Sequence, residues 1–274
     1  MKRTILTGLV AIGAGAMCLM AQAPPPATPA APGQMPIAKQ MKAKSKSELE
    51  AWNALVQAAG DPDKAIAAAE NLITKFADTD FKGIALYVEA DAYQRKGDYD
   101  HMLIFAERVL EVSPQDFRAT LMLANYYATR TRENDLDREE KLGKAEKYAN
   151  QLIDMMKTAP KPNPGLTDEQ WTEAKQDTTA EAYNAIGLAN LTRKKYDVAA
   201  AAFKSAVDAN SQPEPAYMVR EASALQAGGK NDEAIALVDK LTAIPNVHPQ
   251  IKSVAAAIRA AAVKAGGKAP GEAK

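Results

Sequence analysis

Apolar and small side chains recur at helical spacing along most of the chain, and the clearest example lies between Tyr183 and Pro213. Two helix faces occur there, each filled at positions i, i+3, i+4 and i+7, and the polar run 193–197 separates them. Small residues at Gly187 and Ala199 allow two antiparallel helices to approach closely, so the pattern predicts a helical hairpin. The first face consists of Tyr183, Ile186, Gly187 and Asn190, and the second of Ala199, Ala202, Phe203 and Ala206.

The same alternation of helix face, turn and helix face predicts four more hairpins. In the first of them, Leu49, Trp52 and Val56 share one face of the opening helix, which starts at Ser45 or Ser47. One hairpin leaves its own apolar faces uncovered, so we expect the hairpins to stack into a continuous core with an end cap. The predicted hairpins lie near 46–80, 81–114, 115–157, 167–213 and 214–248, and a capping helix follows at 249–265.

The hairpin around Tyr183 resembles the tetratricopeptide repeat, whose aromatic, Leu-Gly, Ala, Phe and Pro signature recurs about every 34 residues. The resemblance covers residues 45–249 and implies an all-α, right-handed α-α solenoid of about five hairpins closed by the capping helix. In the fourth hairpin, the signature positions are held by Tyr183, Ile186-Gly187, Ala199, Phe203 and, about two residues late, Pro213.

The second hairpin is the next best match to this signature. Met102 stands where the central Ala belongs, and Ala106 stands where the second aromatic belongs. The larger and the smaller side chain have therefore exchanged positions along the second helix of this hairpin, and their total volume is nearly unchanged.

Two segments interrupt the regular spacing. The charged segment 130–141 lacks the glycine and the late glutamate of a calcium-binding EF-hand loop, so we interpret it as a solvated, salt-bridged helix extension. The proline-containing segment 160–165 precedes Thr167 and Gln170, whose spacing predicts a capping box and a helix from Asp168. Trp171 on this helix is either an exposed docking residue or, the favoured interpretation, a side chain packed on the previous hairpin.

The amino terminus has the basic, apolar and small-residue regions of a secretory signal peptide at 1–23, so we expect an exported protein, periplasmic or secreted. Cleavage after Ala21 and cleavage after Ala23 are both compatible with the pattern. The single cysteine, Cys18, follows Met17 in a poor lipobox, so membrane contact through a lipid is expected only if Cys18 is modified. We expect 24–44 to be a flexible Pro/Ala/Lys-rich leader and 266–274 a disordered tail.

Composition and motifs narrow the function classes. The 34 basic and 34 acidic residues give no net charge, which argues against nucleic acid as a partner. The two histidines, His101 and His248, form no metal-binding motif, and no nucleophile elbow or phosphate-binding glycine motif follows the signal segment. We therefore expect no enzyme activity, no cofactor, no metal and no small-molecule substrate.

The family resemblance implies that the first helices of the hairpins line a concave groove that holds a protein or peptide segment. Arg95 and Arg118 come from successive first helices, and we expect them to converge on one acidic segment of the partner. The family's carboxylate clamp of lysines, arginines and asparagines is not reproduced. The implied groove residues are Ile84, Tyr87, Asp91, Gln94, Arg95, Arg118, Leu121, Asn125, Ala128, Thr129, Glu181, Asn184, Leu188, Leu191 and Thr192.

Three functions fit these observations. The favoured one is an exported adaptor or scaffold that binds a protein partner through the groove. A narrower version is a subunit of an outer-membrane assembly or envelope-maintenance complex. An enzyme or carbohydrate-binding protein on a helical scaffold is the alternative of another class, and it requires a pocket of convergent acids and aromatics. The groove positions are also compatible with exposed residues that bind nothing.

Overall fold

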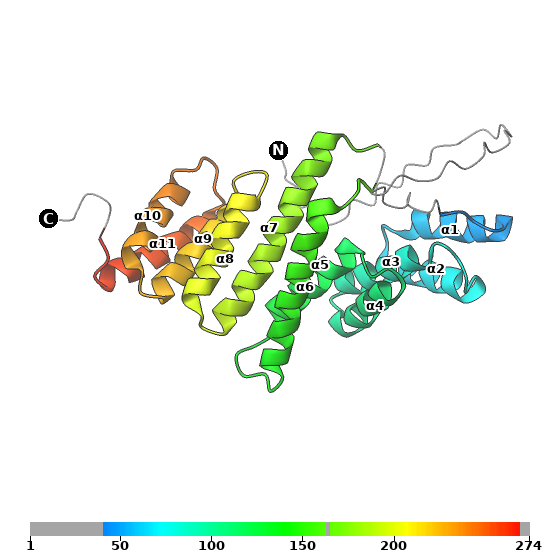
Figure 1. The fold of residues 1–274 in the computed structure, drawn as a ribbon, viewed down its shortest axis with the longest axis horizontal. Coiled ribbons are helices and arrows are strands. Elements are labelled where there is room, and N and C mark those ends of the chain that lie inside the picture. Colours follow the sequence, from blue (N-terminus) through cyan, green and yellow to red (C-terminus); the bar gives the residue numbers. More distant parts are fainter. Residues whose placement is uncertain (1–40, 163–164, 269–274) are drawn as a thin grey trace, which may run out of the picture.

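The computed structural model describes residues 41–162 and 165–268, which form eleven α-helices and no strand (Figure 1). The helices are α1 (Lys46–Ala58), α2 (Pro62–Lys75), α3 (Lys82–Lys96), α4 (Tyr99–Val112), α5 (Phe117–Arg130), α6 (Arg138–Thr158), α7 (Asp168–Thr192), α8 (Tyr196–Ala209), α9 (Pro215–Ala227), α10 (Asn231–Thr242) and α11 (Pro249–Lys264).

Each helix packs against the next along the chain, and further contacts join α5 to α7 and α9 to α11. In Figure 1 the array runs from α1 at one end to α10 and α11 at the other, and the long helices α6 and α7 cross its middle. The expectation of an all-α solenoid of stacked hairpins with a last helix at the carboxyl end is confirmed. None of the helices in 41–162 and 165–268 is both long and apolar enough to cross a membrane.

Local sequence signals set the helix starts. The side chains of Asp61 and Asp116 accept hydrogen bonds from first-turn N–H groups of α2 and α5, which have no partner inside the helix. Thr167 and Gln170 form the expected capping box, and α7 begins at Asp168 as predicted. Gly97 ends α3 with φ 75°, a left-handed conformation that glycine adopts without steric cost.

The close helix approach predicted in the fourth hairpin is present. Phe203 and Ala199 on α8 are completely buried, and a Cβ atom added at Gly187 on α7 would lie 2.5 Å from the Phe203 ring. Any larger side chain at Gly187 therefore requires the ring to move. Ala201, on the same helix as Ala199, is exposed, which confirms the predicted register of α8.

The predicted face of the first helix is wrong at Leu49, whereas Trp52 packs against the core as expected. Leu49 is 46% exposed, whereas Glu48 is 1% exposed and Leu55 lies in the core. Glu48 carboxylate oxygens accept hydrogen bonds from the Thr79 hydroxyl at 2.6 Å and from the Lys44 backbone N–H at 2.5 Å. Because these bonds satisfy a buried carboxylate, the helix is turned about its axis relative to the face that apolar spacing alone selects.

Phe81 and Trp52 connect this first helix to the second hairpin. The Trp52 ring on α1 stacks on the ring of Phe81, which directly precedes α3, with a centroid distance of 4.3 Å. Trp52 is half-buried and packs against the core that the first hairpin shares with α3.

The two irregular segments are both tied to the fold. In the first, only residues from Arg138 onward are helical, so the predicted helix extension begins later than expected and 131–137 form a turn. Lys141 forms ion pairs with Asp135 at 3.5 Å and with Asp137 at 2.9 Å, which holds this turn against α6.

In the second segment, Trp171 packs as the favoured interpretation predicted. It is 8% exposed, its indole N–H donates to the carbonyl oxygen of Ala159 at 3.2 Å, and its ring lies 5.9 Å from that of Phe117 on α5. The start of α7 is thereby fixed against the preceding hairpin.

Only some of the predictions for the two ends of the chain fall on residues that the structure describes. Residues 1–40, which include the signal-peptide region and most of the leader, lie outside the described residues, as does 269–274 of the tail. Ser45 caps α1, one of the two predicted starts. Residues 266–268 do not follow the expectation of disorder, because they turn back on the fold and the Lys268 backbone N–H donates to Asp232 at 2.7 Å.

Candidate functional site: the first-helix surface

The groove residues implied by the sequence come from α3, α5 and α7, which are the first helices of the second, third and fourth hairpins. The structure brings several of them together in pairs that bridge neighbouring hairpins, and it adds residues of α9. We refer to the side chains of α3, α5, α7 and α9 described below as the first-helix surface. Most of them are partly exposed, whereas Asn184 and Tyr217 are buried, at 9% and 8% exposure.

Arg118 and Tyr87 form the contact between α3 and α5. The Arg118 guanidinium lies 4.2 Å from the centroid of the Tyr87 ring and donates to Asp116 at 2.6 and 3.2 Å. Burial raises the pKa of Tyr87 to about 12, so its hydroxyl is neutral at physiological pH. Arg118 therefore already has an ion pair and a cation–π contact within the fold.

Arg95 is likewise already engaged within the fold. Its guanidinium pairs with Asp91 one turn earlier at 2.9 Å and donates to the carbonyl oxygens of Ala59 at 2.9 Å and Gly60 at 3.4 Å. These carbonyls lie just after the end of α1, where basic side chains interact favourably with unpaired backbone oxygens. Gln94 next to it is half-buried. The sequence pattern did not reveal that both arginines have structural partners.

Asn125 and Glu181 form the contact between α5 and α7. The Asn125 side-chain amide donates to the Glu181 carboxylate at 3.3 Å. Burial raises the pKa of the Glu181 carboxyl, and the nearby Asp177 adds to this, whereas the hydrogen bond from Asn125 lowers it. Glu181 is thus a partly exposed carboxylate with one long hydrogen bond, which favours an additional donor or cation.

Asn184 and Arg220 form the contact between α7 and α9. The Arg220 guanidinium donates to the Asn184 side-chain oxygen at 2.7 Å and lies 5.9 Å from the Tyr217 ring centroid. Burial raises the pKa of Tyr217, and the charge of Glu181 raises it further.

Tyr217 and Arg220 were missed by the sequence reasoning, which followed the groove only as far as α7. Arg220 comes one residue after Val219, the position of α9 that a spacing of 35 residues makes equivalent to Asn184. Extending the repeat spacing to the fifth hairpin would have pointed to this turn of α9, although not to Arg220 itself.

Half-buried leucines accompany these polar pairs. Leu188 packs against the core shared by the second, third and fourth hairpins and also against the core shared by the fourth and fifth hairpins and α11. Leu191 packs against the second of these cores. Leu121 packs against the core on α5. Apolar surface broken by fixed hydrogen-bonding groups suits an extended or helical segment of another protein. In the described ranges 41–162 and 165–268, no group of three or more His, Cys, Asp or Glu side chains could hold a metal ion.

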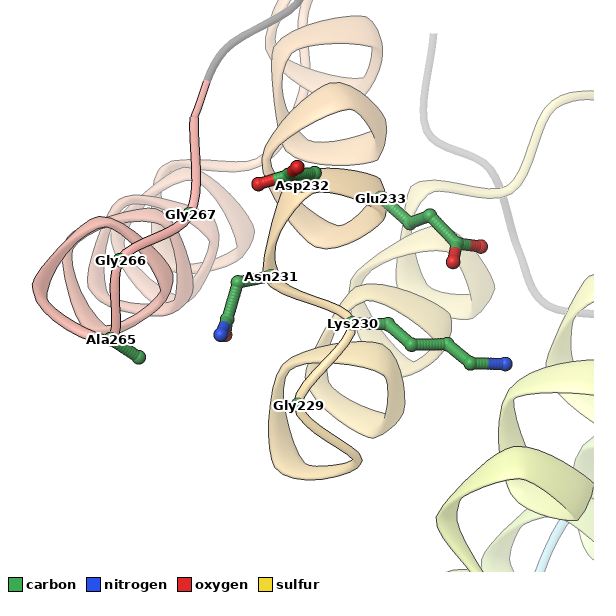
Figure 2. Close-up of a pocket in the computed structure, with 8 residues that line it drawn as sticks. All are labelled: Gly229, Lys230, Asn231, Asp232, Glu233, Ala265, Gly266 and Gly267. Carbon is green, nitrogen blue, oxygen red and sulfur yellow. The ribbon is translucent and has the colours of Figure 1, made fainter. Parts of the chain in front are cut away.

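A shallow hollow at the carboxyl end lies away from these residues. Figure 2 shows it between the start of α10 and the segment that follows α11, lined by residues 229–233 and 265–267. A Cβ atom at Gly267 would lie 2.6 Å from the Cβ of Asn231, so glycine is needed for the close approach of the two segments. The hollow is a packing junction, and it contains none of the groove residues expected from the sequence.

Comparison with known proteins finds similarity both to a family model and to solved structures. The tetratricopeptide repeat family model matches residues 84–116 and 180–213, which correspond to the hairpin α3–α4 and to the hairpin formed by α8 and the second half of α7. The fold is similar to the crystal structure of a thermophilic TPR protein from Thermus thermophilus, with a TM-score of 0.50 and 19% sequence identity over 77% of this chain and 98% of that one. No curated protein matches this chain.

Proposed function

Because this chain is a tetratricopeptide-repeat protein, and such repeats commonly form protein-interaction scaffolds, we propose that it is an adaptor that binds a protein partner through its first-helix surface. Most of the groove residues of α3, α5 and α7 implied by the sequence form the body of this surface, and Arg220 extends it onto α9. Ala128 does not belong to it, because it is 4% exposed and lies in the core.

The observation that supports this proposal is the set of bridging polar pairs on the first helices. Asn125 pairs with Glu181, and the buried Asn184 pairs with Arg220, so the half-buried Asn125, Glu181 and Arg220 are hydrogen-bonding groups held in fixed positions. A partner segment that meets such groups loses little free energy in ordering them. The half-buried Leu188 lies one turn beyond Asn184 along α7 and provides apolar area.

The charges on this surface favour a partner segment that is itself basic near Glu181. The charges of Arg95 and Arg118 are offset by Asp91 and Asp116. By contrast, the hydrogen-bond donor that meets Glu181 within the described part of the chain is the neutral amide of Asn125, so a lysine or arginine of the partner gains the most there.

We also propose that the adaptor works outside the cytoplasm. The support is the signal-peptide pattern at 1–23, and a role in an envelope complex is compatible with it. Intact-mass measurement of the exported protein is expected to give a chain that starts at Gln22 or Pro24 without lipid, and a diacylated Cys18 would refute this part of the proposal.

Site-specific photocrosslinking tests the binding surface. A benzophenone side chain at Thr129, which is exposed on α5, is compared with one at Val198, which is exposed on the second helix α8. In envelope extracts, we expect a discrete adduct from position 129 and none from position 198. An adduct from position 198 alone, or equal yields from both, would place the working surface elsewhere.

A further inference from the structure

A carboxyl group is buried in the second hairpin without any hydrogen bond. Glu89 on α3 is 1% exposed, and neither of its carboxylate oxygens has a hydrogen-bond partner among the described residues. An ionised carboxylate in such a place is strongly disfavoured, because nothing replaces the water that it loses. The protonated form is therefore the form that fits the packed hairpin.

The equivalent positions in the third and fourth hairpins are apolar. Leu123 on α5 and Ile186 on α7 hold this place, and each is followed by a small residue, as Glu89 is followed by Ala90. Leu123 is completely buried. In the fifth hairpin the equivalent residue is Glu221, but its side chain is half-buried, whereas Glu89 is 1% exposed. A fully buried glutamate at a core position breaks the local packing rule, and such breaks are expected at functional positions.

The charged groups around Glu89 come from both helices that pack against α3. Glu70 on α2 disfavours its ionisation, and Arg108 on α4 favours it, but burial has the largest effect and raises the pKa of Glu89 to about 8. Arg108 lies over the Phe105 ring at 4.9 Å and does not hydrogen-bond the carboxylate.

The charge of Glu89 also affects Tyr93, which lies one turn further along α3. Its pKa is raised by burial first, and then by Glu70 and Glu89. Its ring stacks on Phe105 and His101 of α4, which ties this side of α3 to α4.

We propose that Glu89 is a proton-controlled joint between the first hairpin, α1–α2, and the rest of the solenoid. With Glu89 protonated, α2 and α3 stay packed. Once it is ionised, the carboxylate is repelled by Glu70 of α2, attracted by Arg108 of α4 and drawn toward water, so the contact between α2 and α3 loosens. The joint controls one end of the first-helix surface, because Arg95 of α3 contacts the end of α1.

The direction of the pH effect follows from the two protonation states. The pKa of Glu89 is about 8 in the folded protein, above its ordinary value of 4.5. The contribution of protonated Glu89 to the free energy of unfolding is therefore fully present below about pH 4.5. It decreases as the pH rises and is lost once the pH passes about 8. We therefore expect α2 and α3 to pack most closely in acid and most loosely in mildly alkaline solution.

Trp52 provides a direct readout of the joint. It stacks on Phe81 across the boundary between the first hairpin and α3, and Trp171 is the only other tryptophan in the sequence. In a Trp171→Phe background, we expect Trp52 emission to move to longer wavelength, and acrylamide quenching to increase, as the pH is raised from about 6 to about 9.5, with a midpoint near 8.

Two variants at position 89 and one control decide the result. Glu89→Gln and Glu89→Leu, the latter restoring the residue type of Leu123, are expected to remove the transition, whereas Glu221→Gln, at the equivalent but half-buried position of α9, is expected to keep it. The proposal is overturned if the parent protein shows no transition, if either position-89 variant keeps it, or if Glu89→Leu fails to fold.

Discussion

The hairpin α3–α4 and the hairpin α7–α8 match the same repeat model but fill their interiors differently. In α7–α8, the Phe203 ring lies directly against Gly187. In α3–α4, the corresponding ring is replaced by Ala106, and the bulk moves one turn earlier to Met102, with Ala90 opposite; all three are buried. Similar total volume at different positions thus gives the same helix pair, which shows that the repeat constrains the sum of side chains more than any single one.

The same two hairpins also differ where they meet their neighbours. Position 186 is an isoleucine packed against the core, whereas the equivalent position 89 is a buried glutamate whose oxygens have no hydrogen-bond partner in 41–162 and 165–268. The packing of the fourth hairpin at this position therefore does not depend on pH, whereas the packing of the second hairpin depends on whether Glu89 is protonated. Three sets of substitutions test how far this difference in packing goes.

Removing the ring of the fourth hairpin should have the largest effect. Phe203 is completely buried, so Phe203→Ala leaves a cavity and should lower the free energy of unfolding by about 3–5 kcal/mol. Val198→Ala, at a half-exposed site on the same helix, should cost under about 0.5 kcal/mol. Chemical denaturation measures both. A loss below about 1 kcal/mol for Phe203→Ala would mean that the ring is not central to this hairpin.

Overpacking the same hairpin should have an intermediate effect. Ala199 is completely buried and Ala201 is exposed, so Ala199→Leu should cost roughly 1–3 kcal/mol and Ala201→Leu very little. The second hairpin already holds Met102 at the position equivalent to 199, and Met102→Leu should be tolerated. Urea titrations of the three variants compare the sites, and equal losses at 199 and 201 would contradict the register of α8.

The smallest effect concerns the last turn of each first helix. Arg95 hydrogen-bonds the end of α1, whereas the equivalent Thr192 donates only to the carbonyl of Leu188 in its own helix at 3.1 Å. Arg95→Ala should therefore cost about 0.5–1.5 kcal/mol, and Thr192→Ala less than about 0.5 kcal/mol. Thermal unfolding measures both, and the reverse order would show that Arg95 does not hold α1.

Much of the fold was predictable because the same spacing of small and large side chains recurs from one repeat to the next. Small residues at 187 and 199 indicated the close approach in α7–α8, and Thr167 with Gln170 indicated the start of α7. The register of α1 was not predictable from apolar spacing, because it depends on Thr79, 31 residues away from Glu48 in sequence. A terminal helix also has one neighbour fewer, so its apolar pattern constrains it less.

The candidate site was predictable in location but not in chemistry. Repeat spacing identified α3, α5 and α7 as the source of the surface, yet it did not show that Arg118 pairs with Asp116 or that Asn184 meets Arg220. Such pairs depend on how successive hairpins rotate relative to one another, and that rotation is fixed by side-chain packing over the whole array.

Amide hydrogen exchange of the chain with and without its photocrosslinked partner tests the central claim most directly. The proposed function predicts that protection on binding concentrates in α5, α7 and α9, around Asn125, Glu181 and Arg220, while the second helices α4, α6, α8 and α10 remain unchanged. Protection confined to those second helices would contradict binding through the first-helix surface.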